Sequence, residues 1–359
     1  MMNCTRRLRA RFAAVYIATG AQRQKRLPAL DYRHAWVVDG AAYLAAANAG
    51  RPLPLGRRLV VIGGGSAALD AARSARRAGH EVTVLSLESR AQLPAQREEV
   101  EEALEEGVVL CDGAMLQKAE ERAGQVHLDC TRVRFEAGAR RGEFASIPLE
   151  GGAFELVADA LLTSIGQDPD LEALGAVCST HGALLAVDER QASGVAGVWA
   201  GGDVASTARF VTDAIGQGRR AALDIDRTLR ARAGESPQAQ LDGPGAPPAR
   251  TVEREAPVPL AAIATFYHPK RMRAAERRLE ATARLARDAE VQLPLEDAAA
   301  LAETARCFSC GTCIRCDNCV VVCPDLAVRR VADGYEVLGD YCKGCGLCVR
   351  ECPTGSMDG

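Results

Sequence analysis

Residues 59–85 read LVVIGGGSAALDAARSARRAGHEVTVL. The apolar run Leu59–Ile62 predicts a buried strand, and small apolar residues recur at helical spacing along Ser66–Ala78. Gly79 stands where a C-terminal helix cap belongs. A further strand is predicted over Glu81–Leu87, and it completes a βαβ unit. These residues therefore predict an α/β fold with a Rossmann-like domain.

The turn between this strand and helix has the spacing of a dinucleotide-binding motif. The pattern G-x-G-x-x-A gives as candidate contacts Gly63, Gly65, Ser66 and Ala68. Glycines let the backbone approach a pyrophosphate, and a helix N-terminus presents free N–H groups to it. A tight structural turn is the alternative. The strand and helix on either side favour the dinucleotide site.

The choice between NAD and NADP is set near the end of the strand Glu81–Leu87. An acidic side chain there binds the ribose of NAD, whereas arginines hold the additional phosphate of NADP. Glu88 lies 25 positions after Gly63, close to the expected spacing of about 20. Arg90 is the nearest arginine. The sequence favours NAD, with NADP and a merely solvated Glu88 as alternatives.

Ten of the fourteen cysteines lie between Cys307 and Cys352. Two runs, Cys313–Pro324 and Cys342–Pro353, read C-x-x-C-x-x-C-x-x-x-C-P. This is the spacing of two [4Fe–4S] clusters that exchange their fourth ligands. Cluster one is expected to take Cys313, Cys316, Cys319 and Cys352, and cluster two Cys342, Cys345, Cys348 and Cys323. Zinc also uses C-x-x-C pairs, but it gives no reason for two runs that both end in proline.

The other cysteines give weaker signals. Cys307 and Cys310 could ligate a further centre, substitute in cluster one or do neither. The default role of a buried small hydrophobe applies to Cys4, Cys111, Cys130 and Cys178. No C-x-x-C precedes Cys307, so the usual dithiol–disulfide reductase site is absent from the sequence. Cluster thiolates need a reducing compartment, which predicts a cytoplasmic location.

Composition and charge exclude several function classes. Lys and Arg number 44 and Asp and Glu 47, which leaves a net charge of −3 and disfavours general nucleic-acid binding. No apolar run approaches the about 20 residues that span a bilayer. The basic and then apolar start is read as mature protein, because its apolar part is short and no small-residue cleavage site follows.

The rest of the chain has a simple organisation. Strands are predicted over Phe12–Ile17 and within the strand-to-turn junction Gly197–Asp203, and a helix over Val211–Leu229. Nine of the 26 residues in 234–259 are Pro or Gly, which predicts an extended linker. An apolar stripe from Met272 to Ala286 predicts a helix that packs on the parent domain, with its Arg and Glu residues in solvent.

The order of motifs over residues 10–230 resembles the small subunit of glutamate synthase and related flavin-dependent pyridine-nucleotide oxidoreductases. The matching pieces are Ala18-Thr19-Gly20, Gly63 to Ala68, Ser164 to Pro169 and Ala200-Gly201-Gly202-Asp203. Glu105–Val108 looks like that family's second nucleotide-domain strand. Residues 313–353 resemble the bacterial two-cluster ferredoxin, and Ala302–Gly311 resembles the lead-in of relatives with a ferredoxin tail. Those relatives include electron-input subunits of 2-oxoacid oxidoreductase complexes.

The resemblance implies a flavoprotein in which Asp203 binds the FAD ribityl chain and Ala18 to Gly20 pass behind the cofactor. The candidate cofactor contacts that it adds are Ala18, Thr19, Gly20, Gly166, Gly202 and Asp203. Two features depart from the family pattern. Leu87 and Glu88 stand where the family usually carries arginines, and the family's first G-x-G-x-x-G turn is missing. Either the coding start is wrong or truncated, or a separate chain supplies this turn.

The predicted domains follow from the resemblance. They are two parts of a partial FAD-binding domain (1–55 and 158–233), an inserted NAD(P)-binding Rossmann domain (56–157), a linker with an amphipathic helix (234–300) and a small α+β ferredoxin-like domain (301–359). No catalytic side chain is predicted.

The predicted function is electron transfer between NAD(P)H, FAD, two [4Fe–4S] clusters and a partner protein, in either direction. The partner would be the catalytic subunit of a complex, such as a 2-oxoacid oxidoreductase or a glutamate synthase-like large subunit. One alternative is a non-enzymatic ferredoxin-type carrier or a truncated fragment that does not hold FAD by itself. Another is zinc-dependent partner binding.

Overall fold

The computed structural model describes residues 4–138, 143–172, 174, 179–234, 258–286 and 289–357. The chain forms two compact units, one from residues 1–237 and 280–289 and the other from residues 238–279 and 290–359. Most of the predicted linker, and Cys178, lie outside the described residues. Within the described ranges, every helix is too short or too polar to cross a membrane.

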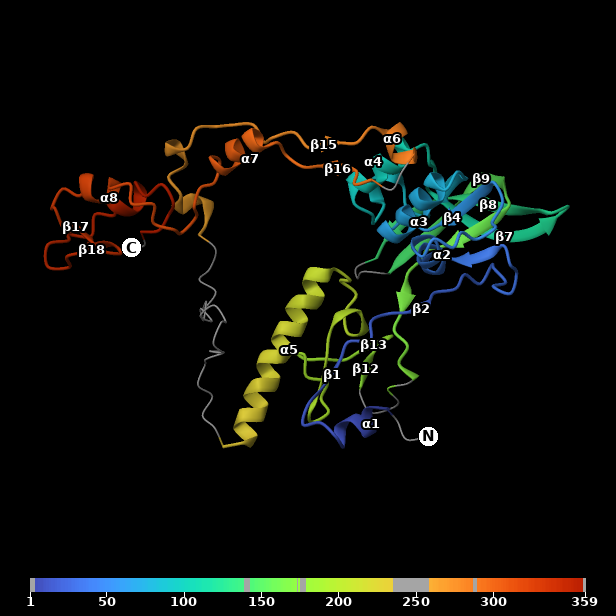
Figure 1. Ribbon diagram of the computed structural model, residues 1–359, viewed down its shortest axis with the longest axis horizontal. Coiled ribbons are helices and arrows are strands. Elements are labelled where there is room, and N and C mark those ends of the chain that lie inside the picture. The colour runs from blue at the N-terminus through green and yellow to red at the C-terminus, as the bar shows by residue number, and fades with distance from the viewer. Residues whose placement is uncertain are drawn as a thin grey trace. The chain divides into compact units, whose positions relative to one another are not determined.

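A five-stranded parallel sheet forms the centre of the first unit (Figure 1). Its strands, in spatial order, are β3 (Val37–Asp39), β10 (Ala160–Thr163), β4 (Arg58–Ile62), β5 (Glu81–Leu85) and β6 (Val109–Cys111). All four neighbouring pairs are parallel, which confirms the predicted α/β class. β3 and β10 lie outside the range predicted for this domain, 56–157, and extend its sheet.

Helices cover one face of this sheet. They are α2 (Gly40–Asn48), α3 (Ser66–Arg77) and α4 (Arg97–Glu105). The buried residues of α3 are mostly alanines, which pack with Leu59 and Val61 of β4. Because alanine side chains are small, α3 lies close to the sheet. The N-terminus of α3 therefore lies next to the end of β4, and only a short turn joins them.

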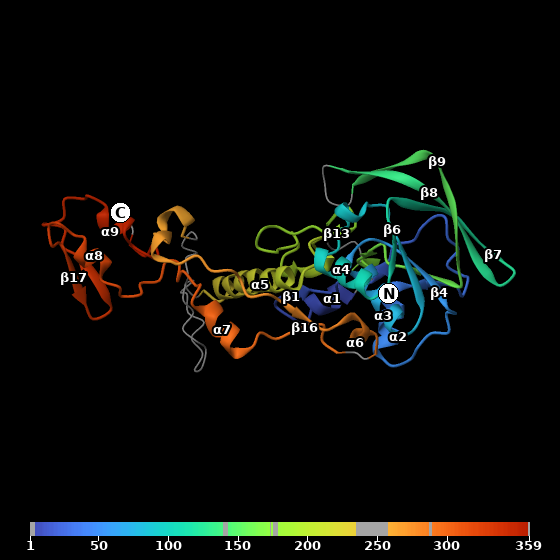
Figure 2. The same cartoon turned by 90° about the horizontal axis from the view of Figure 1, so that it is seen from above.

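An antiparallel sheet covers the opposite face (Figure 2). Its strands are β7 (Ala114–Arg122), β8 (Gln125–Ala137) and β9 (Phe144–Ala158), in that spatial order. Val60 and Ile62 of β4 share a core with Leu128 of β8. Since alternate residues of β4 point to opposite faces, its continuous apolar run is buried on both sides. The nucleotide-binding part is thus three layers thick.

A smaller part of the first unit contains β1 (Val15–Ile17) and β14 (Val198–Ala200), which pair in parallel. The other elements of this part are α1 (Cys4–Arg9), β2 (Arg23–Gln24), β11 (Gln167–Asp168), β12 (Thr180–His181), β13 (Leu184–Leu185) and α5 (Val211–Arg232). Ile17, Val198 and Val204 contribute to its small core. β2 and β11 pair as an antiparallel ribbon within the two connections to the parallel sheet.

The second unit carries the cysteine runs. Its elements are β15 (Arg277–Arg278), β16 (Gln292–Leu293), α7 (Asp297–Thr304), α8 (Asn318–Val321), β17 (Val328–Val331), β18 (Gly334–Val337) and α9 (Leu347–Arg350). β17 and β18 form a hairpin. Each cysteine run is a loop followed by a one-turn helix, so the two runs form an internal repeat.

Two sequence predictions were wrong. The stripe from Met272 to Ala286 is not one helix, because only α6 (Ala281–Ala286) is helical and Met272 is 92% exposed. Its charged face is not all in solvent either, since Arg284 is buried. Glu105–Val108 is not a strand: it closes α4 and turns through Gly107 (φ +85°) into β6.

Candidate functional site

The turn between β4 and α3 requires glycine at its first position. A Cβ on Gly63 would lie 2.3 Å from the carbonyl oxygen of Ser164, and Gly63 has a φ of +137°. A Cβ on Gly64 would lie 2.7 Å from the end of the Leu93 side chain, so a larger residue there would have to displace that side chain. The Cβ of Ala68 lies 3.3 Å from where a Cβ of Gly63 would lie, so the helix passes close to the turn.

The N-terminus of α3 is open for an anion. Gly65 is the N-cap, no side chain caps the helix, and the space where a Cβ of Gly65 would lie is empty within 4 Å. Ser66 begins the helix. The first N–H groups of a helix and its dipole attract a phosphate when no side chain occupies that position. This geometry suits the pyrophosphate of a dinucleotide.

Glu88 lies beside this turn. Its Oε2 atom is 2.9 Å from the position of a Cβ on Gly64, and its carbonyl accepts hydrogen bonds from the Ser86 hydroxyl and the Gly113 N–H. The loop after β5 is therefore held so that a carboxylate faces the glycine turn. Arg90 is exposed on η1 (Arg90–Gln92), where its backbone N–H donates to Asp112.

The end of β10 forms the neighbouring wall. Ser164 donates its N–H to Ile62 of β4 and has a buried hydroxyl that lacks a partner within the described part of the chain. Gly166 follows with a φ of +96°, and its carbonyl accepts from the Lys25 N–H of the adjoining segment. Gly166 thus lies where the chain leaves the parallel sheet for the β2–β11 ribbon.

The smaller part of the first unit brings two predicted turns together. Because β1 and β14 are parallel, with Ile17 opposite Ala200, Ala18–Gly20 and Gly201–Asp203 lie at the same edge. Gly20 (φ +72°) has no atom within 4 Å of where a Cβ would lie. Gly202 (φ +75°) donates its N–H to Gln217 of α5 at 2.6 Å. The structure thus brings Ala18–Gly20 and Gly201–Asp203, which the resemblance implies for FAD, to one edge.

Four cysteines line one cavity in the second unit. They are Cys313, Cys316, Cys319 and Cys352, and the cavity is also lined by Tyr335, Pro353, Thr354, Ser356 and Met357. Cys352 is thus far from the first run in sequence and adjacent to it in space. Four cysteines around one cavity match the residue types that ligate an iron–sulfur cluster, while the described residues form no group of three or more side chains arranged to hold a metal ion.

Cys352 has hydroxyl neighbours that the sequence analysis did not single out. The hydroxyl of Ser356 is 3.4 Å from its Sγ atom, and that of Thr354 is 3.6 Å away. Burial raises the pKa of the Cys352 thiol, but hydrogen bonds from Ser356 and Thr354 outweigh burial and lower this pKa to about 7. The two hydroxyls therefore favour the thiolate that a cluster needs.

Each set of four has two exposed cysteines, Cys313 and Cys316 in the first and Cys342 and Cys345 in the second. The remaining pair is buried in the first set and partly buried, as Cys323 and Cys348, in the second. The Sγ atom of Cys323 accepts the Ala327 N–H at 3.2 Å. Cys307 and Cys310 are exposed. In the first unit, burial raises the pKa of the Cys130 thiol to about 12, which fits an inert structural residue.

The protein-family model described as "Pyridine nucleotide-disulphide oxidoreductase" matches residues 4–218. The chain belongs to this family. A second model, "4Fe-4S dicluster domain", matches residues 312–357. The chain thus joins a domain of an oxidoreductase family to an iron–sulfur domain, as the sequence predicted.

Curated relatives support the same assignment. The NADP(+)-dependent formate dehydrogenase subunit beta of Moorella thermoacetica is 35% identical over 228 residues, which are 61% of this chain and 32% of that protein. A putative glutamate synthase [NADPH] small chain of Cereibacter sphaeroides is 32% identical over 61% of this chain and 56% of its own length. The putative oxidoreductase YgfK of Escherichia coli K12 is 28% identical over 95% of this chain and 30% of its own length. The chain therefore spans 30% to 56% of the length of these relatives, and the predicted resemblance to the glutamate synthase small subunit is confirmed.

Proposed function

We propose that this chain transfers electrons between NADH and a partner protein by way of FAD and two [4Fe–4S] clusters. The observation that carries the proposal is the convergence of Cys313, Cys316, Cys319 and Cys352 on one cavity, in a chain that also has an open dinucleotide turn. A hydride carries two electrons and a cluster accepts one. A flavin between them supplies that conversion when bound.

The dinucleotide would bind at the carboxyl end of β4. Gly63 and Gly64 allow the backbone to approach the pyrophosphate, and the uncapped N-terminus of α3 at Gly65 and Ser66 provides N–H donors. Ala68 keeps the helix against the turn because a larger side chain would meet Gly63. These residues bind and orient the cofactor. None of these residues transfers a proton in the proposed reaction.

We assign NAD as the preferred nucleotide. The Glu88 carboxylate beside Gly64 can accept hydrogen bonds from the ribose hydroxyls, and its charge would repel the 2′-phosphate of NADP. The relatives from Moorella and Cereibacter are named for NADP(+) and NADPH. In this proposal the chain prefers NAD over NADP, because Leu87 and Glu88 stand where relatives usually carry arginines that bind the 2′-phosphate of NADP.

The flavin would lie over the paired ends of β1 and β14. Gly20 leaves room for it, and Asp203 lies on the same edge, where its carboxylate can bind ribityl hydroxyls. Gln217 holds the intervening loop through the Gly202 N–H, so the position of Asp203 depends on α5. Gly166 lies at the end of the wall that β10 forms, and the flavin site would share this wall with the nucleotide site.

The clusters would exchange their fourth ligands. Cluster one takes the cavity cysteines Cys313, Cys316, Cys319 and Cys352, and cluster two takes Cys323, Cys342, Cys345 and Cys348. Cys307 and Cys310 are left outside both sets. Both sets include two exposed cysteines, so both clusters would be accessible to a partner, which fits relatives that are named as subunits. A 2-oxoacid oxidoreductase or a glutamate synthase-like large subunit is the class of partner we propose, in the reducing cytoplasm.

An anaerobic cofactor inventory tests this function. About eight irons with acid-labile sulfide and one FAD are expected per chain. NADH should bleach the flavin and should reduce a one-electron dye, whereas clusters without flavin and without response to NADH would leave only a ferredoxin-type carrier. Zinc in place of iron would reject both proposals.

A substitution tests the nucleotide assignment separately. Glu88→Arg removes the carboxylate that faces the ribose and adds a cation for a phosphate. We expect the ratio of kcat/KM for NADH over NADPH to fall by about 10-fold to 100-fold, in line with 1 to 3 kcal/mol for one polar contact. Arg97→Met, an exposed substitution on α4, is the control. An unchanged ratio in Glu88→Arg would contradict the role of Glu88.

A further inference from the structure

Helix α6 belongs to the nucleotide-binding unit although it lies in the segment that leads to the ferredoxin-like domain. Residues 280–289 are part of the first unit, while residues on both sides of them are part of the second. α6 packs on α3. The contact is close to the C-terminal end of α3, where Arg77 is the last residue, and the open turn lies at the opposite end. α6 therefore leaves the nucleotide site uncovered.

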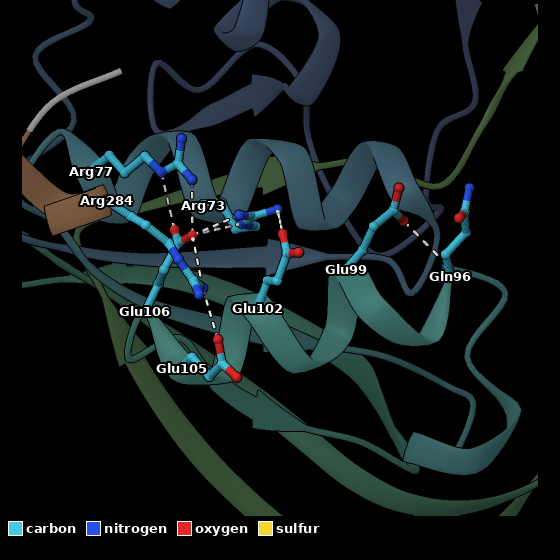
Figure 3. A network of polar contacts seen from close by, with 8 residues as sticks. All are labelled: Arg73, Arg77, Gln96, Glu99, Glu102, Glu105, Glu106 and Arg284. Carbon is cyan, nitrogen blue, oxygen red and sulfur yellow. Dashed lines mark hydrogen bonds and ion pairs between the residues drawn. The ribbon is translucent and has the colours of Figure 1, made fainter. Parts of the chain in front are cut away.

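Arg284 of α6 is inserted into a cluster of charged residues between α3 and α4 (Figure 3). It is 3% exposed, its Nη1 donates to Glu105 at 2.8 Å, and it lies 4.0 Å from Glu106. Glu106 has a fully buried side chain and also accepts from Arg73 at 2.6 Å and Arg77 at 2.9 Å. Arg284 thus joins an ionic network inside the domain.

Arg284 adds a cation to this network. The ion pairs between described residues join Arg73, Arg77 and Arg284 to Glu102, Glu105 and Glu106. Without Arg284, Glu105 loses this partner, and the fully buried Glu106 loses a nearby positive charge. Buried charges are tolerated when they are paired, and removing one partner is strongly destabilising. The sequence of α4 thus carries an acidic end that α6 neutralises.

We propose that α6 is an internal clip, with Arg284 as its ionic contact, that fastens the segment before the ferredoxin-like domain to the nucleotide-binding domain. The functional consequence, which rests on the proposed function, is a shorter tether between the flavin and the clusters. Arg284 is a positioning residue in this account. It contacts neither nucleotide nor cysteine.

The segment that precedes α6 already contacts the cluster-bearing residues. The Ala264 N–H donates to the Cys352 carbonyl, and the His268 ring lies 3.0 Å from the Pro353 carbonyl. α6 therefore adds a second attachment to the one that the chain after α5 provides, and release of α6 would lengthen the connection and lower the effective concentration of one domain at the other. Where encounter of the domains limits electron transfer, the rate falls by the same factor.

The first experiment tests whether Arg284 fastens α6 to the domain, and it does not depend on electron transfer. In the full chain, hydrogen–deuterium exchange is compared between wild type, Arg284→Met, Glu105→Gln and the double variant, with Arg97→Met as the exposed control. The N–H groups of Ala283 and Arg284 both donate to the Glu280 carbonyl. We expect their protection to fall at least about tenfold in Arg284→Met and less in Glu105→Gln. The double variant should resemble Arg284→Met, because both substitutions break one contact.

Single-turnover electron transfer then tests the tether. In the holoprotein, NADH should reduce the flavin at the wild-type rate in Arg284→Met, and the following reduction of the clusters should be at least about twofold slower. Equal protection of α6 in Arg284→Met and wild type would overturn the clip. Faster exchange with unchanged cluster reduction would overturn the tether. Failure of NADH to reduce any variant would reject the proposed function, and the exchange result would still decide the clip.

Discussion

The two cysteine loops have the same spacing and different surroundings. In the loop Cys313–Cys319, Arg315 (φ +56°) and Asp317 (φ +66°) adopt the left-handed conformation, whereas the equivalent positions of Cys342–Cys348 are glycines with φ +71° and +70°. A side chain costs free energy in this conformation and glycine does not. The first loop therefore adopts the same backbone under strain.

Contacts in the first loop offset this strain. The Asp317 carboxylate accepts hydrogen bonds from Arg330 Nε at 2.6 Å and from the Tyr335 hydroxyl at 2.7 Å. The Arg330 guanidinium and the Tyr335 hydroxyl hold the pKa of Asp317 below its usual value. The first loop is thus fixed by side chains of the β17–β18 hairpin, and the second by its glycines.

The cysteines of the two sets also differ in burial. Both sets have two exposed cysteines, but the other two are buried in the first set (Cys319 and Cys352) and only partly buried in the second (Cys323 and Cys348). In addition, Cys352 has two hydroxyl neighbours. Reduction potentials of clusters depend on hydrogen bonds to sulfur and on exposure to solvent. The spacing of the cysteines thus selects the ligands, whereas the residues around the cysteines determine the reduction potential of each cluster.

Exchange of the fourth ligands is the prediction with the largest effect. Cys352→Ala should remove cluster one and Cys323→Ala cluster two, so each should halve the iron content to about four per chain. The double variants are the sharper measurement. Cys352→Ala with Cys316→Ala should keep about four irons, and Cys352→Ala with Cys345→Ala should keep almost none. The reverse result would mean that each run binds its own cluster.

Hydrogen bonds to Cys352 give a smaller effect that separates the two clusters. Because a hydroxyl donor stabilises the more negative, reduced cluster, Ser356→Ala should shift the midpoint potential of cluster one to a more negative value. The potential of cluster two should stay unchanged. Redox titration monitored by electron paramagnetic resonance measures both, with Ser309→Ala as a hydroxyl control. A shift confined to cluster two would contradict the ligand assignment.

Backbone strain gives the smallest effect. Gly346→Ala places a side chain at φ +70° and should lower the free energy of unfolding by about 1 kcal/mol. Arg315→Gly relieves strain at φ +56° and makes the unfolded chain more flexible, so its effect should be within about 0.5 kcal/mol of zero. Denaturant unfolding of the holoprotein measures both. Equal losses in the two variants would show that the loops do not differ in strain.

The parts of the fold that the sequence predicted are local. β4, the glycine turn, α3 and β5 follow each other without interruption, and each cysteine run has a fixed spacing. Glu88 was identified because it directly follows the strand predicted over Glu81–Leu87, although β5 itself ends at Leu85. Gln217, whose side chain accepts a hydrogen bond from the Gly202 N–H, was not singled out. It lies inside the predicted helix Val211–Leu229, and nothing in that pattern indicates its partner.

The parts that the sequence did not predict depend on distant contacts. Arg284 was assigned to a solvated helix face, but its partners Glu105 and Glu106 lie almost 180 positions earlier in the chain. The flanking strands β3 and β10 join the parallel sheet from outside the predicted range. Neither the ion pairs of Arg284 nor the pairing of β3 with β10 leaves a periodic signal in the sequence. For Arg284 in particular, burial of a charge depends on a partner that only the fold brings close.

An anaerobic titration of the purified full chain with NADH, followed by absorbance and electron paramagnetic resonance, tests the central claim most directly. We predict that NADH bleaches the flavin and that signals of two distinct reduced [4Fe–4S] clusters then appear. Their assignment follows from the loss of one signal in Cys352→Ala and of the other in Cys323→Ala. Clusters that dithionite reduces but NADH does not, in a chain with bound flavin, would contradict the account.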